Sequence, residues 1–237
     1  MCGRVNVSSG PLTLLFMDMV GQPYPRISRD TAPDTDRYNV APTEPLPVLR
    51  MGGSGVESAP MRWWLTPYWS KELSTKYSMF NAKSETLETS RAFSEPFARR
   101  RCAVPICGYY EWTKDGDRKL PYYIRPQADE GMLLGGIWDR WRNGDETIES
   151  FSVVTTAVHD RLAFVHSRQP AMLTRAEGLR WMSRDADREG LRAELLRPRV
   201  PMPLSVIPVS TYVNNSRNEG TRCIEPIGRT IEIDVEA

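Results

Sequence analysis

The chain has 237 residues and a formal net charge of +1 at pH 7, with 40% hydrophobic and 26% charged residues. These values are those of an ordinary globular protein, and they exclude a strongly basic domain whose whole surface attracts nucleic acid. The longest early apolar run, Leu12 to Met17, is too short to cross a membrane. We expect no signal peptide, because a basic region followed by a cleavable apolar stretch is not seen. We therefore expect a cytoplasmic, monomeric protein, in which DNA could contact only a local basic patch such as Arg99–Arg101.

The first predicted element is a helix over Leu12–Met19, because Leu12, Leu15, Phe16 and Met19 share one helical face. Ser8 and Ser9 precede it as candidate caps. The stretch from 21 to 47 is rich in proline and shows little periodicity, which predicts a long irregular loop of functional character.

Strand-like runs dominate the middle of the chain, at Met61–Leu65, Cys102–Ile106, Gly108–Thr113, Tyr122–Arg125, Met132–Trp138 and Phe151–Thr156. The residues 114 to 117 between two of these runs predict a hairpin turn. Helical patterns occur at Lys83–Ser90, Phe93–Ala98, Asp160–Val165, Ala176–Met182 and Asp187–Leu196. Since no βαβ alternation or phosphate-binding glycine loop is present, we expect one α+β domain over 1–237, built on a mostly antiparallel, curved, barrel-like sheet with flanking helices.

The four cysteines are too few and too widely spaced for a disulfide scaffold, and with only two histidines a structural zinc site is not expected. We therefore expect no metal and no cofactor. Cys102, Cys107 and Cys223 are interpreted as small buried apolar residues. Cys2 differs from these three because it is the second residue of the sequence.

Removal of Met1 would leave Cys2 with a free α-amine beside its own thiol. An α-amine has an ordinary pKa of about 7.7–8.0, so part of it is neutral and nucleophilic in the cell. The thiol, with an ordinary pKa of about 8.5, could be activated further by a cation such as Arg4. The amine can form a Schiff base with an aldehyde, and the thiol can then close a thiazolidine ring. The alternative is that Cys2 merely follows the start codon.

Three more residues are candidates for imine chemistry, and each also has an ordinary structural interpretation. Asn81 precedes a predicted helix, where it could simply be a cap. Glu111 alternates with the aromatic residues of its predicted strand, where burial would raise its pKa as an acid or base requires, unless it is an exposed strand residue. His166 could transfer protons, although a lone histidine is more often structural.

Five ordered motifs together resemble the SRAP family, the SOS response-associated peptidases or abasic-site-processing proteins. They are Met-Cys-Gly-Arg at 1–4, Arg-Tyr-Asn-Val-Ala-Pro-Thr at 37–43, Asn-Ala-Lys-Ser-Glu-Thr at 81–86, Gly-Tyr-Tyr-Glu-Trp at 108–112 and His-Ser-Arg-Gln-Pro at 166–170. The segment 209–215 is similar to the C-terminal motif of that family. The resemblance spans nearly the whole chain, and it implies a barrel-like α+β domain beside a positively charged DNA channel.

The resemblance also implies functions for individual residues. Cys2 would crosslink to the ring-opened aldehyde of an abasic site in single-stranded DNA, shielding the site during the response to DNA damage. Asn81 would orient the Cys2 amine, Glu111 would act as acid and base, and His166 would move protons at the sugar. Phosphate contacts and channel-lining positions would fall on Arg4, Lys83, Arg168, Asn39, Trp69 and Thr155. Lyase activity and self-catalysed removal of Met1 are further implied possibilities.

This chain departs from the family pattern at several positions. Lys83 stands where arginine is usual, which keeps the charge but loses bidentate phosphate geometry. Ser167 and Gln169 replace two members of the histidine motif, and Trp64 follows Trp63 where glycine is commoner. We expect crosslinking to survive these changes, with effects on its rate or reversal.

Two other functions remain open from the sequence. An N-terminal-nucleophile amidohydrolase, such as a glutaminase, also begins with Met-Cys-Gly, although the expected glutamine-binding motifs are not seen. A passive single-stranded-DNA-binding module would need a basic groove with interleaved aromatic residues, which a net charge of +1 supports poorly.

Overall fold

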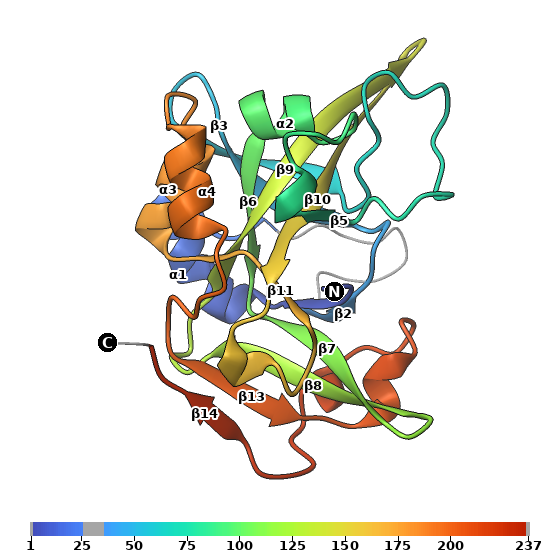
Figure 1. Ribbon diagram of the computed structural model, residues 1–237, viewed down its shortest axis with the longest axis vertical. Helices are drawn as coiled ribbons and strands as arrows, with labels where there is room; N and C mark the ends of the chain where they lie inside the picture. The colour runs from blue at the N-terminus through green and yellow to red at the C-terminus, as the bar shows by residue number, and fades with distance from the viewer. Residues whose placement is uncertain (1, 26–35, 236–237) are drawn as a thin grey trace.

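The computed structural model describes residues 2–25 and 36–235, and within them five strands close into a barrel (Figure 1). These strands are β3 (Pro45–Met51), β4 (Val56–Arg62), β6 (Arg101–Ile106), β9 (Met132–Asn143) and β10 (Glu146–Ala157). Their order is β10-β4-β3-β6-β9, and the pairing of β9 with β10 completes the ring. All of these pairings are antiparallel except β4 with β10, which is a parallel bridge between Arg62 and Ser150.

Three short strands extend the barrel sheet. β5 (Asn81–Lys83) and β11 (Arg168–Pro170) both pair with β10, and β12 (Met172–Leu173) pairs with β9. Two of the motif segments noted in the sequence are therefore held against the same long strand.

A second sheet has the strand order β14-β13-β8-β7-β1-β2 and occupies the lower half of Figure 1. Its members are β1 (Val5–Val7), β2 (Arg37–Val40), β7 (Gly108–Asp115), β8 (Arg118–Pro126), β13 (Leu204–Pro208) and β14 (Ile231–Ile233). β7 and β8 form the expected hairpin, with Gly116 at φ 58° in its two-residue turn, where glycine adopts positive φ without strain. The antiparallel barrel and flanking sheet confirm the predicted α+β fold class.

Helices cover one side of the barrel: α1 (Ser9–Val20), α3 (Arg175–Met182) and α4 (Arg188–Leu195) lie together on the left of Figure 1. α2 (Ser94–Arg99) lies at the top of the same view. The α3 residue Trp181 is fully buried, and its indole nitrogen donates to the Cys102 and Gly136 carbonyl oxygens at 3.0 Å each. Trp181 thus anchors α3 to the barrel strands β6 and β9.

The start of α1 is capped differently from the expectation. The side chain of Ser8 makes no capping hydrogen bond. Instead, Asp36 accepts hydrogen bonds from the Ser9 backbone nitrogen at 2.8 Å and from the Ser9 hydroxyl at 2.9 Å. A carboxylate from just before β2 therefore satisfies the first turn of the helix.

Several predicted elements differ from the structure. The stretch predicted as an irregular loop contains β2 and the start of β3, while its residues 26–35 lie outside the described part of the chain. The strand predicted at Met61–Leu65 begins earlier, as β4, and ends at Arg62. The helix predicted at Lys83–Ser90 is only a 3₁₀ turn, η1 (Ser84–Thr86), because Asn81–Lys83 pair with β10. A second 3₁₀ turn, η2 (Asp160–Leu162), replaces most of the helix predicted at Asp160–Val165.

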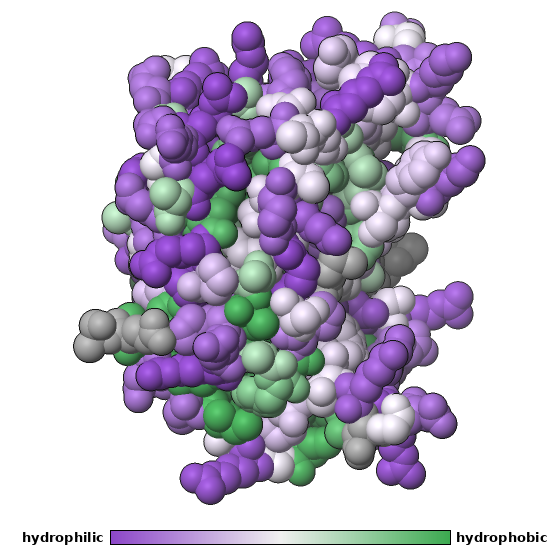
Figure 2. Space-filling view, viewed as in Figure 1, coloured by the Kyte–Doolittle hydropathy of each residue, from purple (hydrophilic) through white to green (hydrophobic). Residues whose placement is uncertain are grey.

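None of the helices in the described residues combines the length and apolar character that a bilayer crossing requires. Hydrophilic side chains cover most of the face shown in Figure 2, and its hydrophobic residues form small separate patches.

Candidate functional site

A pocket of about 750 Å³ opens between the β7–β8 hairpin and the first residues of the chain. Its lining comes from segments far apart in the sequence, namely Gly3, Arg4, Phe80, Glu111, Trp112, Thr113, Lys114, Lys119, Val165, His166 and Asn214. The fold therefore brings Arg4, Glu111 and His166, which the sequence nominated, around one cavity. Cys2 immediately precedes the lining residue Gly3.

Asn81 fixes the position of Cys2. Its amide nitrogen donates to the Cys2 carbonyl oxygen at 2.8 Å. Asn81 is itself held in place because β5 pairs with β10, with Asn81 opposite Val153. The Asn81 Oδ1 atom is buried and has no hydrogen-bond partner among the described residues. An acceptor left unsatisfied in this way is costly, so the site retains an acceptor position suited to a ligand or a new donor.

Glu111 lies on β7 with its side chain almost wholly buried, 3% exposed. Strand alternation places Tyr109 on the same face, while Tyr110 packs on the other face in a separate core cluster. Burial raises the pKa of the Glu111 carboxyl above its ordinary value, and the nearby charge of His166 opposes that rise only in part. Burial thus favours the protonated form of the Glu111 carboxyl, as a group that gives and takes a proton requires.

The sequence suggested that Arg4 lowers the pKa of the Cys2 thiol, but the structure shows the opposite shift. Cys2 is fully buried, and this desolvation, reinforced by the negative charge of Glu111, raises the pKa of its thiol well above the ordinary value. The prediction of a lowered pKa is therefore wrong for this conformation. In this environment the thiol is protonated at neutral pH.

His166 is half-buried at the edge of the pocket, just before β11. Its Nδ1 atom accepts a hydrogen bond of 3.0 Å from the backbone nitrogen of Arg168. The neutral ring consequently carries its proton on Nε2, so the backbone defines which nitrogen donates.

Arg4 and Asn39 form a hydrogen-bonded unit in which Arg4 is half-buried. Asn39, on β2, is fully buried; its Oδ1 accepts from Arg4 at 2.7 Å, and its amide nitrogen donates to the carbonyl oxygens of Asn215 and Asn218. Arg4 also donates to the Val213 carbonyl oxygen at 2.9 Å. The expectation that Asn39 lines a DNA channel is therefore corrected, because its side chain has no exposed surface and instead orients Arg4.

Lys83, Thr155 and Arg168 lie together where β5 and β11 flank β10. Lys83 is exposed, whereas Thr155 is fully buried and cannot line a channel, contrary to the expectation. Arg168 donates to the Thr155 carbonyl oxygen at 2.6 Å and to the Glu85 carboxylate at 2.7 and 3.0 Å. Arg168 must therefore exchange the Glu85 carboxylate for any phosphate that it binds.

Trp69 lies away from the Cys2 pocket, in a separate hollow of about 580 Å³ with Tyr77, Met79 and Arg91 in its lining. The Arg91 guanidinium stacks over the Trp69 ring at 4.2 Å from its centroid. Trp69 is 40% exposed, so an aromatic surface with a cation above it is available there.

The sequence interpretation missed two lysines at the pocket. Lys114 and Lys119 face each other across the β7–β8 hairpin and both line the cavity. Like charges directly opposite on a sheet repel, which favours an anionic ligand at this edge. The signal was available, because the predicted hairpin turn pairs the residues on either side of it.

Tyr109 was also missed. It is buried within the same core cluster as Cys2, and its hydroxyl has no hydrogen-bond partner among the described residues. Strand alternation places it on the face opposite to Tyr110, whose hydroxyl donates to the Tyr38 carbonyl oxygen at 2.7 Å.

The remaining cysteines are structural. Cys102, Cys107 and Cys223 are buried free thiols, which confirms the prediction made for them. Within residues 2–25 and 36–235, no group of three His, Cys, Asp or Glu side chains is arranged to hold a metal ion.

Comparison with known proteins agrees with this arrangement. Residues 1–216 match the family model described as SOS response associated peptidase (SRAP). The chain is 30% identical to the abasic site processing protein YedK of Escherichia coli, over 96% of this chain and all of that one, and 28% identical to YoqW of Bacillus subtilis, over 79% and 85%. A crystal structure of a Bacteroides thetaiotaomicron protein superposes with a TM-score of 0.71 at 26% identity, covering 80% of this chain and 84% of that one. The chain belongs to the SRAP family.

Proposed function

We propose that this protein processes abasic sites in DNA by forming a covalent adduct through an N-terminal Cys2. The observation that carries the proposal is the hydrogen bond from Asn81 to the Cys2 carbonyl oxygen, which holds Cys2 beside the pocket that Glu111 and His166 line. The names of the relatives, abasic site processing proteins, support the same substrate.

The adduct forms in two steps after Met1 is removed. First, the Cys2 α-amine attacks the aldehyde carbon of the ring-opened sugar, and loss of water gives a Schiff base. Next, the thiol sulfur adds to the imine carbon while its proton passes to the imine nitrogen, which closes a thiazolidine. The raised pKa of the buried thiol favours this order, because the amine is the better nucleophile while the thiol stays protonated.

The surrounding residues have distinct functions in this scheme. The unsatisfied Asn81 Oδ1 accepts a hydrogen bond from the Cys2 amine and so directs its lone pair to the aldehyde. Glu111 gives a proton to the oxygen that leaves as water and takes one back on reversal. His166 exchanges a proton with the sugar through Nε2, since its Nδ1 is occupied by the Arg168 backbone nitrogen.

The DNA is held in a single-stranded form. Lys114 and Lys119 contact phosphates at the pocket entrance, and Arg4, oriented by Asn39, contributes from the pocket wall. Trp69 gives an unpaired base a surface on which to stack, at a distance from the reacting sugar. Strand cleavage through the Schiff base competes with thiazolidine closure, so slow closure would favour lyase products.

The test uses a single-stranded oligonucleotide with one abasic site, incubated with the protein and analysed on a denaturing gel. Intact mass measurement first establishes that Met1 is absent. The expected result is a heat-stable adduct that is lost in Cys2→Ala and kept in the control Cys107→Ala, which removes another buried thiol. An undiminished heat-stable adduct from Cys2→Ala would contradict the assignment. Borohydride trapping by Cys2→Ala would further show that the amine alone forms the Schiff base.

A further inference from the structure

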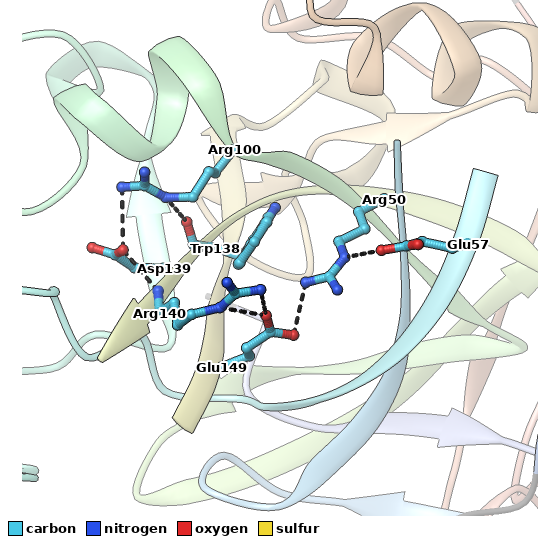
Figure 3. Close-up of polar contacts among 7 residues, drawn as sticks. All are labelled: Arg50, Glu57, Arg100, Trp138, Asp139, Arg140 and Glu149. Carbon is cyan, nitrogen blue, oxygen red and sulfur yellow. Dashed lines mark hydrogen bonds and ion pairs between the residues drawn. The ribbon is translucent and has the colours of Figure 1, made fainter. Parts of the chain in front are cut away.

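A second charged pocket, of about 350 Å³, lies between the end of β3, the start of β6 and the middle of β9. It shares no lining residue with the Cys2 pocket. Its walls carry six arginines and one glutamate, namely Arg50, Arg99, Arg100, Arg101, Arg140, Arg184 and Glu57. We call it the arginine pocket, and Figure 3 shows several of its side chains.

Three of these arginines are paired with carboxylates. Arg50 and Arg140 approach the Glu149 carboxylate from two directions, at 2.7 and 2.6 Å, and Figure 3 shows this shared contact. Arg100 pairs with Asp139 at 3.1 Å and with Glu95. The carboxylates near the pocket are thus engaged by Arg50, Arg100 and Arg140.

The other three arginines leave a surplus of positive charge. Within the described residues, Arg99 and Arg184 are exposed and have no ion pair. Arg101 is buried, and its guanidinium donates to backbone carbonyl oxygens, including those of Trp181 at 2.7 Å and Phe97 at 2.8 Å, rather than to a carboxylate. Carbonyl dipoles satisfy its donors but do not cancel its charge.

The pocket is also organised in advance. The Trp138 ring stacks against Arg50 at 4.7 Å and lies within 5.9 Å of Arg140, and its carbonyl oxygen accepts from Arg100 at 3.2 Å. These contacts immobilise three guanidinium groups before any ligand arrives, which lowers the entropic cost of binding.

We infer that the arginine pocket is an anion site that binds a phosphate group. Arginines that line one pocket from β3, β9 and the junction of α2 with β6 match the several acceptor oxygens of a phosphate better than they match a single planar carboxylate. Glu57 bonds to Arg50 at 2.6 Å and folds against Gly52, where a Cβ atom would lie 2.5 Å from its carboxylate oxygen. This half-exposed carboxylate is the anion that an incoming phosphate displaces.

The site is separate from the proposed chemistry at Cys2. On β10, Glu149 is four residues from Val153, the partner of Asn81, which corresponds to about 13 Å along a strand. The phosphate could come from a free anion or from a flanking phosphodiester of bound DNA, since both present the same oxygens.

The test is calorimetric titration of the full-length protein with inorganic phosphate. Arg99→Gln combined with Arg184→Gln should weaken phosphate binding by roughly tenfold or more, because each removes a charge-assisted contact without breaking an internal ion pair. The matched control, Arg197→Gln with Arg229→Gln, makes the same charge change at exposed residues outside the pocket and should leave the affinity within about twofold. Absence of saturable binding, or an equal loss in both double variants, overturns the inference.

A third variant gives an effect of opposite sign. Glu57→Gln removes the competing carboxylate while Glu149 still holds Arg50, so phosphate affinity should rise several-fold. An unchanged or lower affinity would contradict the displacement of Glu57.

Competition with an intact single-stranded oligonucleotide then shows whether the bound phosphate group comes from DNA or from a free anion. Displacement of phosphate by DNA, lost in Arg99→Gln/Arg184→Gln, assigns the site to a phosphodiester, and no displacement assigns it to a free anion. Adduct formation with a short abasic oligonucleotide provides the separate readout for Cys2.

Discussion

The carboxamide of Asn81 and the backbone carbonyl of Cys2 are joined by a 2.8 Å hydrogen bond across 79 residues of the chain. Because Asn81 is itself paired with β10, this bond connects the start of the chain to the barrel. Cys2 precedes β1, which belongs to the second sheet, whereas Asn81 lies on β5 of the barrel sheet. The position of the proposed nucleophile therefore depends on a contact between the two sheets.

Loss of this bond should affect both stability and adduct formation. Asn81→Asp replaces the donor by an oxygen that repels the Cys2 carbonyl, so we expect the free energy of unfolding to fall by about 1–3 kcal/mol. Adduct formation should slow by at least roughly tenfold, a change of about 1.4 kcal/mol in its barrier. Urea unfolding and quantified gel shifts measure the two effects. The control is Asn214→Ala, which removes a different amide of the pocket. The Oδ1 atom of Asn214 accepts an exposed hydrogen bond from the Trp112 indole nitrogen, so its loss should change stability by less than about 0.5 kcal/mol.

Glu111→Gln should change the pH dependence of stability. Burial raises the folded-state pKa of this carboxyl above the ordinary 4.5, so its protonated form stabilises the fold below pH 4.5 and this contribution is lost as the pH rises through the raised value. The glutamine variant has no such loss, so it should be more stable relative to the unaltered protein at pH 8 than at pH 4. Urea unfolding at both values measures this difference.

The control for Glu111 is Glu85→Gln, for which the sign is reversed. The hydrogen bond from Arg168 lowers the pKa of the Glu85 carboxyl, so its stabilisation is present above pH 4.5 and is lost as the pH falls. Equal pH profiles for the two variants would show that the burial of Glu111 does not control its titration.

Adjacent tyrosines on β7 should respond oppositely to loss of the hydroxyl. Tyr109→Phe removes a buried hydroxyl that has no partner in the described residues, so stability should stay the same or increase by about 1 kcal/mol. Tyr110→Phe removes the donor to the Tyr38 carbonyl oxygen and should cost about 1 kcal/mol. Thermal unfolding of both variants tests this contrast, and destabilisation by Tyr109→Phe would show that its hydroxyl is bonded.

Asn39→Ala should act on DNA binding only through Arg4. It leaves the Arg4 guanidinium without its 2.7 Å acceptor and two loop carbonyls without their donor, so we expect stability to fall by about 2–3 kcal/mol. Affinity for single-stranded DNA should fall by a similar factor in Asn39→Ala and in Arg4→Gln, measured by fluorescence anisotropy at one salt concentration. If the double variant binds much more weakly than either single variant, Asn39 contacts DNA directly.

The sequence predicted the regular, locally encoded parts of the fold. The β7–β8 hairpin, α1, α3 and α4 carry turn residues, caps or an apolar helical face within their own segments. β3 was missed because its prolines argue against a strand. In the structure Pro45 and Pro47 pair only with β4, whereas the pairing of β3 with β6 involves Leu49 and Arg50, so neither proline has to donate a hydrogen bond toward β6.

The candidate site was predictable by residue type but not by geometry. Cys2, Asn81, Glu111 and His166 were nominated by motifs. All four are buried or half-buried, and two of them, Glu111 and His166, line one cavity together with Arg4. Asn39 and Thr155 also belong to motif segments, but only the three-dimensional pairing shows that their side chains face inward. Burial likewise reversed the expected direction of the pKa shift at Cys2, since desolvation outweighs a nearby cation that points elsewhere.

The distances along the chain that separate the pocket residues set an order of events during synthesis. Cys2 acquires its neighbours only after residues 81, 111 and 166 have been made, because these supply the bond to its carbonyl and the walls beside it. Until then the start of the nascent chain lacks these contacts. Since Cys2 has no exposed surface once folding is complete, its own side chain is open to solvent only during translation, before the site exists.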